Sequence, residues 1–108
     1  MTRRKADVAA SRDHEQATIE SLRADSEFAA AYLDAVLDDG DQDEFLLALR
    51  RLSEARGGVQ SVAAKANLNP TSLYRTLSAR GNPELKSMRA VLRALGLRLS
   101  VEPIRRRG

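Results

Sequence analysis

The sequence contains no cysteine, no long apolar run and only one histidine. Without cysteine, neither a disulfide framework nor a cysteine-based zinc site can form. No apolar stretch approaches the roughly 18 residues that span a bilayer, and charges occupy the N-terminus where a signal peptide needs an apolar core. We therefore expect a soluble, cytoplasmic protein, and its 108 residues suffice for one domain with a modest core.

Groups suited to acid–base catalysis are also scarce. His14 lies in a weakly patterned stretch near the N-terminus, and no acid–base pair falls on a predicted rigid element. The carboxylates within residues 38–44 lack the ligand spacing of a calcium loop, and their only glycine precedes most of them. We expect no enzyme, no cofactor and no metal. Two helix ends meeting in one loop explain the acidic cluster, although so acidic a patch could also dock a basic protein.

Carboxylates are nearly absent from the second half of the chain. Residues 1–54 carry 7 Lys/Arg and 13 Asp/Glu, a net charge of −6, whereas residues 55–108 carry 11 and 2, a net charge of +9. Because neutralising phosphates supplies most non-specific affinity for nucleic acid, this division favours a nucleic-acid partner over a basic surface that serves solubility alone.

The basic half contains a stretch, Gly58–Ser78, whose pattern predicts a helix, a tight turn and a second helix. The apolar residues of the first helix recur on one face. They are Val59, Val62, Ala63 and Ala66. Asn67 follows, and asparagine tolerates the left-handed backbone that ends a helix.

The second helix of this pair has a well-marked start. Asn69 offers a side-chain oxygen as N-cap, and Pro70 fits the first helical position. Leu73 and Leu77, four residues apart, predict the buried face. The residues expected outward or at the flanks are Thr71, Ser72, Tyr74, Arg75 and Thr76. This is the layout of a DNA-reading helix-turn-helix.

Three further helices are predicted around this pair. Residues 1–24 form a flexible N-terminal arm, with a weak helical hint near residues 15–23. Helices follow over residues 25–39 and 41–56, each opened by acidic residues. The last begins with Asn82 as cap and Pro83 in the first turn, and Gly96 ends it. The expected buried stripes are Phe28, Ala29, Tyr32, Leu33, Val36 and Leu37, then Phe45, Leu46, Leu49 and Leu52, then Leu85, Met88, Val91, Leu92 and Leu95.

Residues 97–102 alternate apolar and polar side chains, which predicts one short β-strand before the basic tail of residues 103–108. A lone strand has no partner within the chain. It could pair with its own copy across a dimer two-fold axis, add to a partner's sheet, or pack on its own domain as an extended tail.

The region from Gly57 to Leu95 resembles the Xre/lambda-repressor class of helix-turn-helix proteins. A fuller match, over roughly residues 22–102, is to the addiction-module antidote proteins, which are HigA-like antitoxins of bacterial type II toxin–antitoxin systems. The blocks that carry it include Ala55-Arg56-Gly57-Gly58, Leu73-Tyr74-Arg75, Gly81-Asn82-Pro83 and Leu92-Arg93-Ala94-Leu95-Gly96-Leu97.

The resemblance implies an all-α, lambda-repressor-like bundle of about five helices with a C-terminal strand, spanning residues 25–102. It implies a homodimer that binds operator DNA, represses its own operon and neutralises a RelE/ParE-like toxin. Two alternatives stay open: a stand-alone Xre-type regulator, and a protein-interaction module that does not bind DNA.

On the matched positions, the second motif helix faces the major groove. The candidate DNA-binding residues are Gln60, Ser61, Asn69, Pro70, Thr71, Ser72, Tyr74, Arg75, Arg80, Asn82 and Lys86. Arginine can bridge guanine O6 and N7, so Arg75 is the main candidate for a base contact, although it could instead anchor a carboxylate within the fold. Tyr74 could equally pack beside Leu77, and Lys86 could belong to a solvated cationic face.

Overall fold

The part of the chain that the computed structural model describes, residues 16–104, is built of helices and contains no strand. Residues 16–24 are helical, and five labelled helices follow. They are α2 (Ser26–Asp39), α3 (Gln42–Ala55), α4 (Val59–Ala66), α5 (Pro70–Thr76) and α6 (Leu85–Ala94). The predicted all-α class is confirmed. Among these helices, none combines the length and the apolar character that crossing a membrane requires.

Side-chain caps fix the starts of three helices where the sequence predicts them. The carboxylate of Asp25 accepts a hydrogen bond from the Phe28 N–H at 3.0 Å, and that of Asp41 accepts one from the Glu44 N–H at 2.9 Å. The side-chain oxygen of Asn69 begins α5 in the same way. Each cap satisfies a backbone donor that has no partner inside its helix.

Three helices end on a residue with left-handed backbone, again at predicted positions. These residues are Gly57 with φ of 100°, Asn67 with φ of 58° and Gly96 with φ of 77°. After each, the next N–H turns back to a carbonyl five residues earlier, which satisfies an orphan acceptor of the last turn. The pairs are Gly58 to Ser53, Leu68 to Ala63 and Leu97 to Leu92, at 2.9, 2.9 and 2.8 Å.

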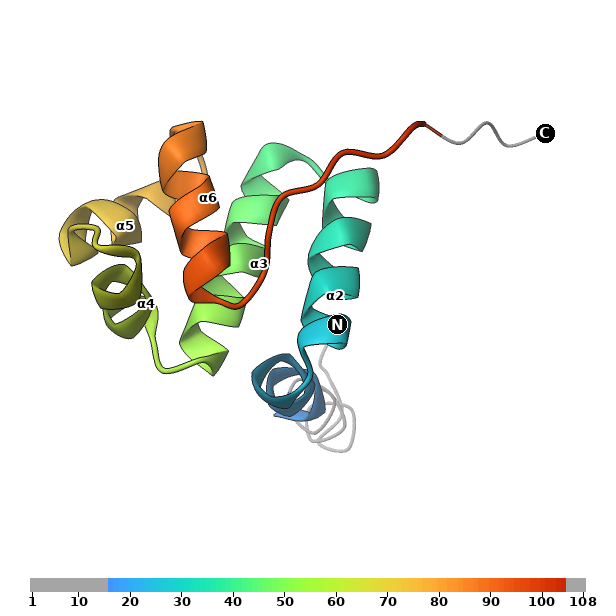
Figure 1. Cartoon of the computed structure of the whole chain (residues 1–108), viewed down its shortest axis with the longest axis horizontal. Coiled ribbons are helices and arrows are strands. Elements are labelled where there is room, and N and C mark those ends of the chain that lie inside the picture. The colour runs from blue at the N-terminus through green and yellow to red at the C-terminus, as the bar shows by residue number, and fades with distance from the viewer. Residues whose placement is uncertain (1–15, 105–108) are drawn as a thin grey trace, which may run out of the picture.

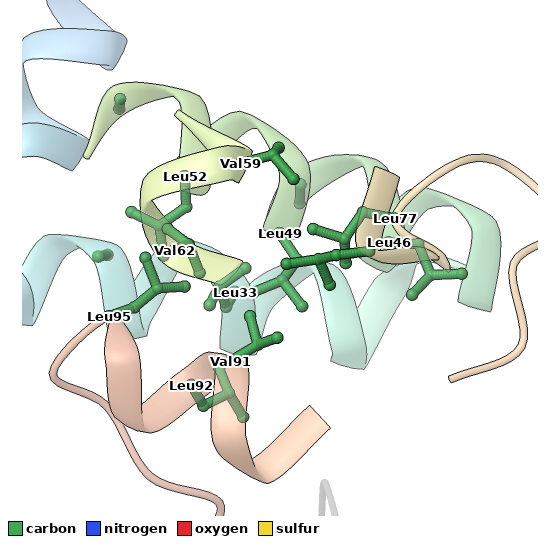
Figure 2. Close-up of a cluster of buried hydrophobic side chains, with 14 of the residues drawn as sticks. Leu33, Leu46, Leu49, Leu52, Val59, Val62, Leu77, Val91, Leu92 and Leu95 are labelled. Carbon is green, nitrogen blue, oxygen red and sulfur yellow. The ribbon is translucent and has the colours of Figure 1, made fainter. Parts of the chain in front are cut away.

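The helices enclose one hydrophobic core, to which every labelled helix contributes. Figure 2 shows side chains from these helices converging on Leu49 of α3. Helix α3 packs against α2 and α4, and α4 packs against α5 and α6. Leu73 and Leu77 hold α5 to this core, because both are almost fully buried. Burying a leucine side chain stabilises the fold by about 1.5–3 kcal/mol.

Arg56, directly after α3, joins parts of the chain that are distant in sequence. Its Nε donates to the Leu22 carbonyl oxygen at 3.0 Å and its Nη1 to the Leu95 carbonyl oxygen at 2.7 Å, with Nη2 3.5 Å from Ser26 Oγ. Both carbonyls belong to the ends of helical segments, where acceptors lack intrahelical partners. One planar guanidinium therefore links residues 16–24, the start of α2 and the end of α6.

The structure extends the packed domain toward the N-terminus. The weak helical hint near residues 15–23 corresponds to the helix over residues 16–24, and Leu22 within it is fully buried. Sequence reasoning assigned this segment to a flexible arm because it holds few large apolar side chains. Ile19 also packs against the core, and Arg56 binds the Leu22 carbonyl group, so few apolar side chains suffice to hold this segment. Residues 1–15, and the tail from residue 105, lie outside the described residues.

The predicted C-terminal strand over residues 97–102 is wrong. Residues 97–104 are extended but form no β-ladder among the described residues, and Val101 is 98% exposed. Alternating side chains predict which faces a strand would present, but a strand also needs a neighbour to accept and donate its backbone hydrogen bonds. In Figure 1 this segment leaves α6, passes α3 and reaches the C-terminal end of α2.

Two further predictions are corrected: where the last helix begins, and which leucines of the predicted stripes are buried. Helix α6 begins at Leu85 with Glu84 as its cap residue, rather than with Asn82 and Pro83. Residues 81–84 are not helical and Glu84 has an extended backbone, and Pro83 disfavours a helical conformation at Asn82 before it. Leu85, expected in the core, is 68% exposed as a result, and Leu37 near the end of α2 is 54% exposed.

Candidate nucleic-acid interface

Helix α5 turns its apolar side inward and its polar side to solvent. Leu73 is 3% exposed and Leu77 is 1% exposed. The polar side chains between and before them are exposed: Thr71, Ser72, Tyr74 and Arg75. The two buried leucines fix the rotation of a helix that is only seven residues long. The polar edge that the sequence predicted as a reading surface is therefore accessible.

The start of α5 is organised by Asn69 and Pro70. Asn69 Oδ1 accepts a hydrogen bond from the Ser72 N–H at 3.0 Å, and Pro70 occupies the first helical turn. The side-chain oxygen of Asn69 is thus engaged in capping, the structural role that sequence reasoning weighed against phosphate contact. The adjacent turn is as expected, since Asn67 adopts the left-handed conformation with φ of 58° and ψ of 45°.

Helix α4 places Gln60 and Ser61 at its N-terminal end. Gln60 is exposed and Ser61 is half-buried, while Val59 and Val62 on either side are buried. The N-terminal turn of a helix carries backbone N–H groups without intrahelical partners, a setting that suits anions. Gln60 is therefore available for contact with a partner, and Ser61 only partly so.

The loop after α5 is held tightly, which sequence reasoning did not predict. A Cβ added at Gly81 would collide with the carbonyl oxygen of Thr76, so only glycine fits against the end of α5. Gln42 Nε2 donates to the Gly81 carbonyl oxygen at 3.1 Å. Asp43 Oδ1 accepts from the Arg80 N–H at 2.8 Å. The first turn of α3 thereby fixes the position of this loop relative to α5.

Three candidate residues follow in and after this loop. Arg80 has a φ of 71°, an uncommon value for a residue other than glycine, and the bond to Asp43 helps to hold it there. The side chains of Arg80, Asn82 and Lys86 are exposed. Between residues 55 and 101 the sequence carries a single carboxylate, Glu84, and the first turn of α3 adds Asp43 beside Arg80.

Arg50 is a residue of this surface that sequence reasoning missed. Its guanidinium carbon lies 5.3 Å from the centroid of the Tyr74 ring, within the range of a cation–π interaction. Arg50 also approaches Glu54, with 4.0 Å between Nε and Oε1. The i, i+4 spacing of Arg50 and Glu54 is a signal visible in the sequence, but nothing in the sequence joins Arg50 to a tyrosine 24 positions later.

Comparisons with known proteins identify the family. A family model described as "Probable addiction module antidote protein" matches residues 14–103, most of the chain. A protein of Haemophilus influenzae, itself described as uncharacterized, is 31% identical over 74 residues, which cover 68% of this chain and 75% of the relative. No solved structure matches the chain significantly.

Proposed function

Since this chain belongs to the family of probable addiction module antidote proteins, we propose that it is an antitoxin that also binds DNA and represses its own operon. The family carries the antidote role, which implies a toxin partner. The geometry of α5 supports the DNA-binding role. That role belongs to the class of helix-turn-helix repressors, which the pair α4 and α5 resembles in layout.

The observation that carries the proposal is the exposed polar edge of α5 on the basic half of the chain. Buried Leu73 and Leu77 leave this edge directed to solvent, and α4 and the loop after α5 brace it from both sides. A reading helix needs such rigid presentation because side chains must meet base edges within hydrogen-bonding distance.

In the proposed complex, Arg75 bridges guanine, while Thr71 and Ser72 contact bases or phosphates at the start of α5. Tyr74, held beside Arg50, directs its hydroxyl to a phosphate. The remaining candidates set the register on the backbone. They are Gln60, Ser61, Asn69, Pro70, Arg80, Asn82 and Lys86.

We further propose a homodimer, because helix-turn-helix repressors read two half-sites with two copies of the reading helix. The resemblance to HigA-like antitoxins supports a RelE/ParE-like toxin as the partner. A gene for a second small protein beside this one is expected on that basis, and its absence would favour a stand-alone regulator.

The test is binding of the purified chain to duplex DNA from upstream of its own gene, measured by fluorescence anisotropy at several salt concentrations. Affinity should fall steeply as salt rises, by about 0.9 log units per log unit of salt for each phosphate contacted. Arg75→Ala should lose the preference for this duplex over an unrelated one, at a cost of about 1–3 kcal/mol.

The matched control is Arg98→Ala, which removes an exposed arginine from the segment after α6 and leaves α5 untouched. Its operator affinity should stay close to that of the unmodified chain. If the unmodified chain binds no duplex even at low salt, the DNA-binding proposal is wrong, and a protein-interaction module becomes the better description.

A further inference from the structure

An open groove runs between α2 and the extended segment of residues 97–104. Ala30, Ala31 and Leu37 line it from α2, and Leu97 and Leu99 line it from the extended segment. Positions 30, 34, 37 and 38 recur at helical spacing, so they share one face of α2. The floor of the groove is apolar, and no described element covers it.

The extended wall of this groove has unused backbone groups. Leu97 is the last residue whose N–H bonds to another backbone group in the described chain; from residue 98 to residue 104 no such bond is formed. Val101 and Ile104 are 98% and 95% exposed. An extended segment with free backbone groups and exposed apolar side chains is suited to pairing with a strand of another chain.

The charge of the groove selects the kind of occupant. Its lining holds four carboxylates and one guanidinium. Asp34, Asp38 and Asp39 stand on α2, and Asp38 and Asp39 lie at its C-terminus, where the helix dipole is already negative and no basic residue sits in the last turn. No ion pair to these three carboxylates occurs among the described residues, and they form no cluster that could hold a metal ion.

We propose that this groove is the docking site for the toxin, and that the toxin fills it with an extended or helical segment carrying apolar side chains flanked by lysine or arginine. This inference rests on the proposed antitoxin function. Apolar side chains of that segment cover Leu37 and Leu99, and its cations pair with the carboxylates of α2.

A second copy of this chain fits the groove less well. An isologous contact centred here brings the carboxylates of α2 against their own copies, which is repulsive. The groove also lies beside α2, at the end of the molecule away from α5 (Figure 1). Copies joined there meet at the ends of the molecules opposite α5. A toxin in the groove leaves α5 accessible.

The experiment uses the full chain and, as probe, the purified product of the neighbouring reading frame. The test variant is Asp34→Lys/Asp38→Lys, which reverses two exposed charges without touching the core. Calorimetry at physiological salt should show affinity for the probe reduced by on the order of 100-fold, about tenfold for each reversed charge. Hydrogen exchange of the unmodified complex should show residues 98–104 newly protected.

The matched control is Glu20→Lys/Glu27→Lys, which makes the same change in net charge at exposed positions outside the groove. It should bind the probe with an affinity within about threefold of that of the unmodified chain, a difference under 1 kcal/mol. The test variant and the control variant should both keep their affinity for duplex DNA. A second test variant, Leu37→Ser, should weaken probe binding without changing net charge.

Three outcomes would overturn the inference. If both groove variants bind the probe as the unmodified chain does, the toxin docks elsewhere. If they bind the probe normally but sediment as monomers where the unmodified chain is a dimer, a second copy occupies the groove. If the unmodified chain itself does not bind the probe, the antitoxin proposal fails, and the inference fails with it.

Discussion

Around α5, the turns and loops form hydrogen bonds with neighbouring elements. Along the groove beside α2, the extended segment beyond Leu97 has no backbone hydrogen-bond partner in the described chain. Asn69 caps α5, and Asp43 and Gln42 hold the loop that follows it. Residues 98–104 form no backbone hydrogen bond within the described chain. The first surface is ordered by contacts within the chain, and the second is the one for which we propose a partner.

This difference matters for a protein proposed to bind two partners. Reading bases requires side chains placed in advance, because ordering them on binding costs free energy. Docking a protein segment by backbone pairing tolerates an extended wall that orders on contact. The two regions also differ in sequence charge: residues 55–101 carry one carboxylate, Glu84, whereas four carboxylates line the groove.

The largest expected difference comes from a leucine-to-alanine substitution made once in each region. Leu77→Ala removes a side chain that is 1% exposed and anchors α5, so it should lower the free energy of unfolding by about 3 kcal/mol. Leu37→Ala removes one that is 54% exposed in the groove and should cost less than about 0.5 kcal/mol. Urea unfolding followed by circular dichroism measures both. Equal losses would mean that the groove is closed in solution.

Arg56 links residues 16–24 to the end of α6, from which the extended wall of the groove continues. Arg56→Ala should lower the free energy of unfolding by about 2 kcal/mol, because two hydrogen bonds from a charged group to helix-end carbonyls are lost. Arg56→Lys keeps the charge but cannot reach both the Leu22 and the Leu95 carbonyls as a planar fork does. We expect it to recover less than half of the loss in the same unfolding assay. Full recovery by lysine would show that charge alone, without the fork geometry, is what stabilises this junction.

Local signals carried most of what the sequence could predict. Asp25, Asp41 and Asn69 act within three residues of themselves, and Asn67 and Gly96 set the backbone at their own positions, so short windows suffice. The buried face of α5 follows from its leucine spacing in the same way. These are the features that position the candidate DNA-binding residues.

Contacts between distant positions could not be predicted. Arg56 reaches Leu22 and Leu95, which are 34 and 39 residues away, and Arg50 reaches Tyr74. The prediction of a C-terminal strand was wrong for a related reason. The alternating pattern of residues 97–102 describes one strand, but a β-ladder also needs a second strand to share its backbone hydrogen bonds. The groove became visible only once α2 and residues 97–104 were seen to share it.

A smaller effect tests whether local capping orders the reading surface. Asn69→Ala removes the acceptor of the Ser72 N–H and should lower stability by about 1 kcal/mol. Asn69→Ser keeps a capping oxygen and should cost only a few tenths of a kcal/mol. Thermal unfolding compares the two. If serine is as destabilising as alanine, a capping oxygen at position 69 does not stabilise α5, and Leu73 and Leu77 alone hold the helix in place.

The smallest expected effect has the opposite sign and concerns the groove. Asp38→Asn/Asp39→Asn removes two negative charges from the C-terminus of α2, where they oppose the helix dipole, so stability should rise by about 0.5 kcal/mol. Glu27→Gln, at the favourable N-terminal end of the same helix, is the control and should lower stability by about 0.3 kcal/mol. Both effects should shrink in 1 M salt, where the Debye length is about 3 Å. A gain in stability together with weaker toxin binding would mean that these aspartates contribute to binding and destabilise the fold. A loss of stability would mean that a cation of this chain lies beside them.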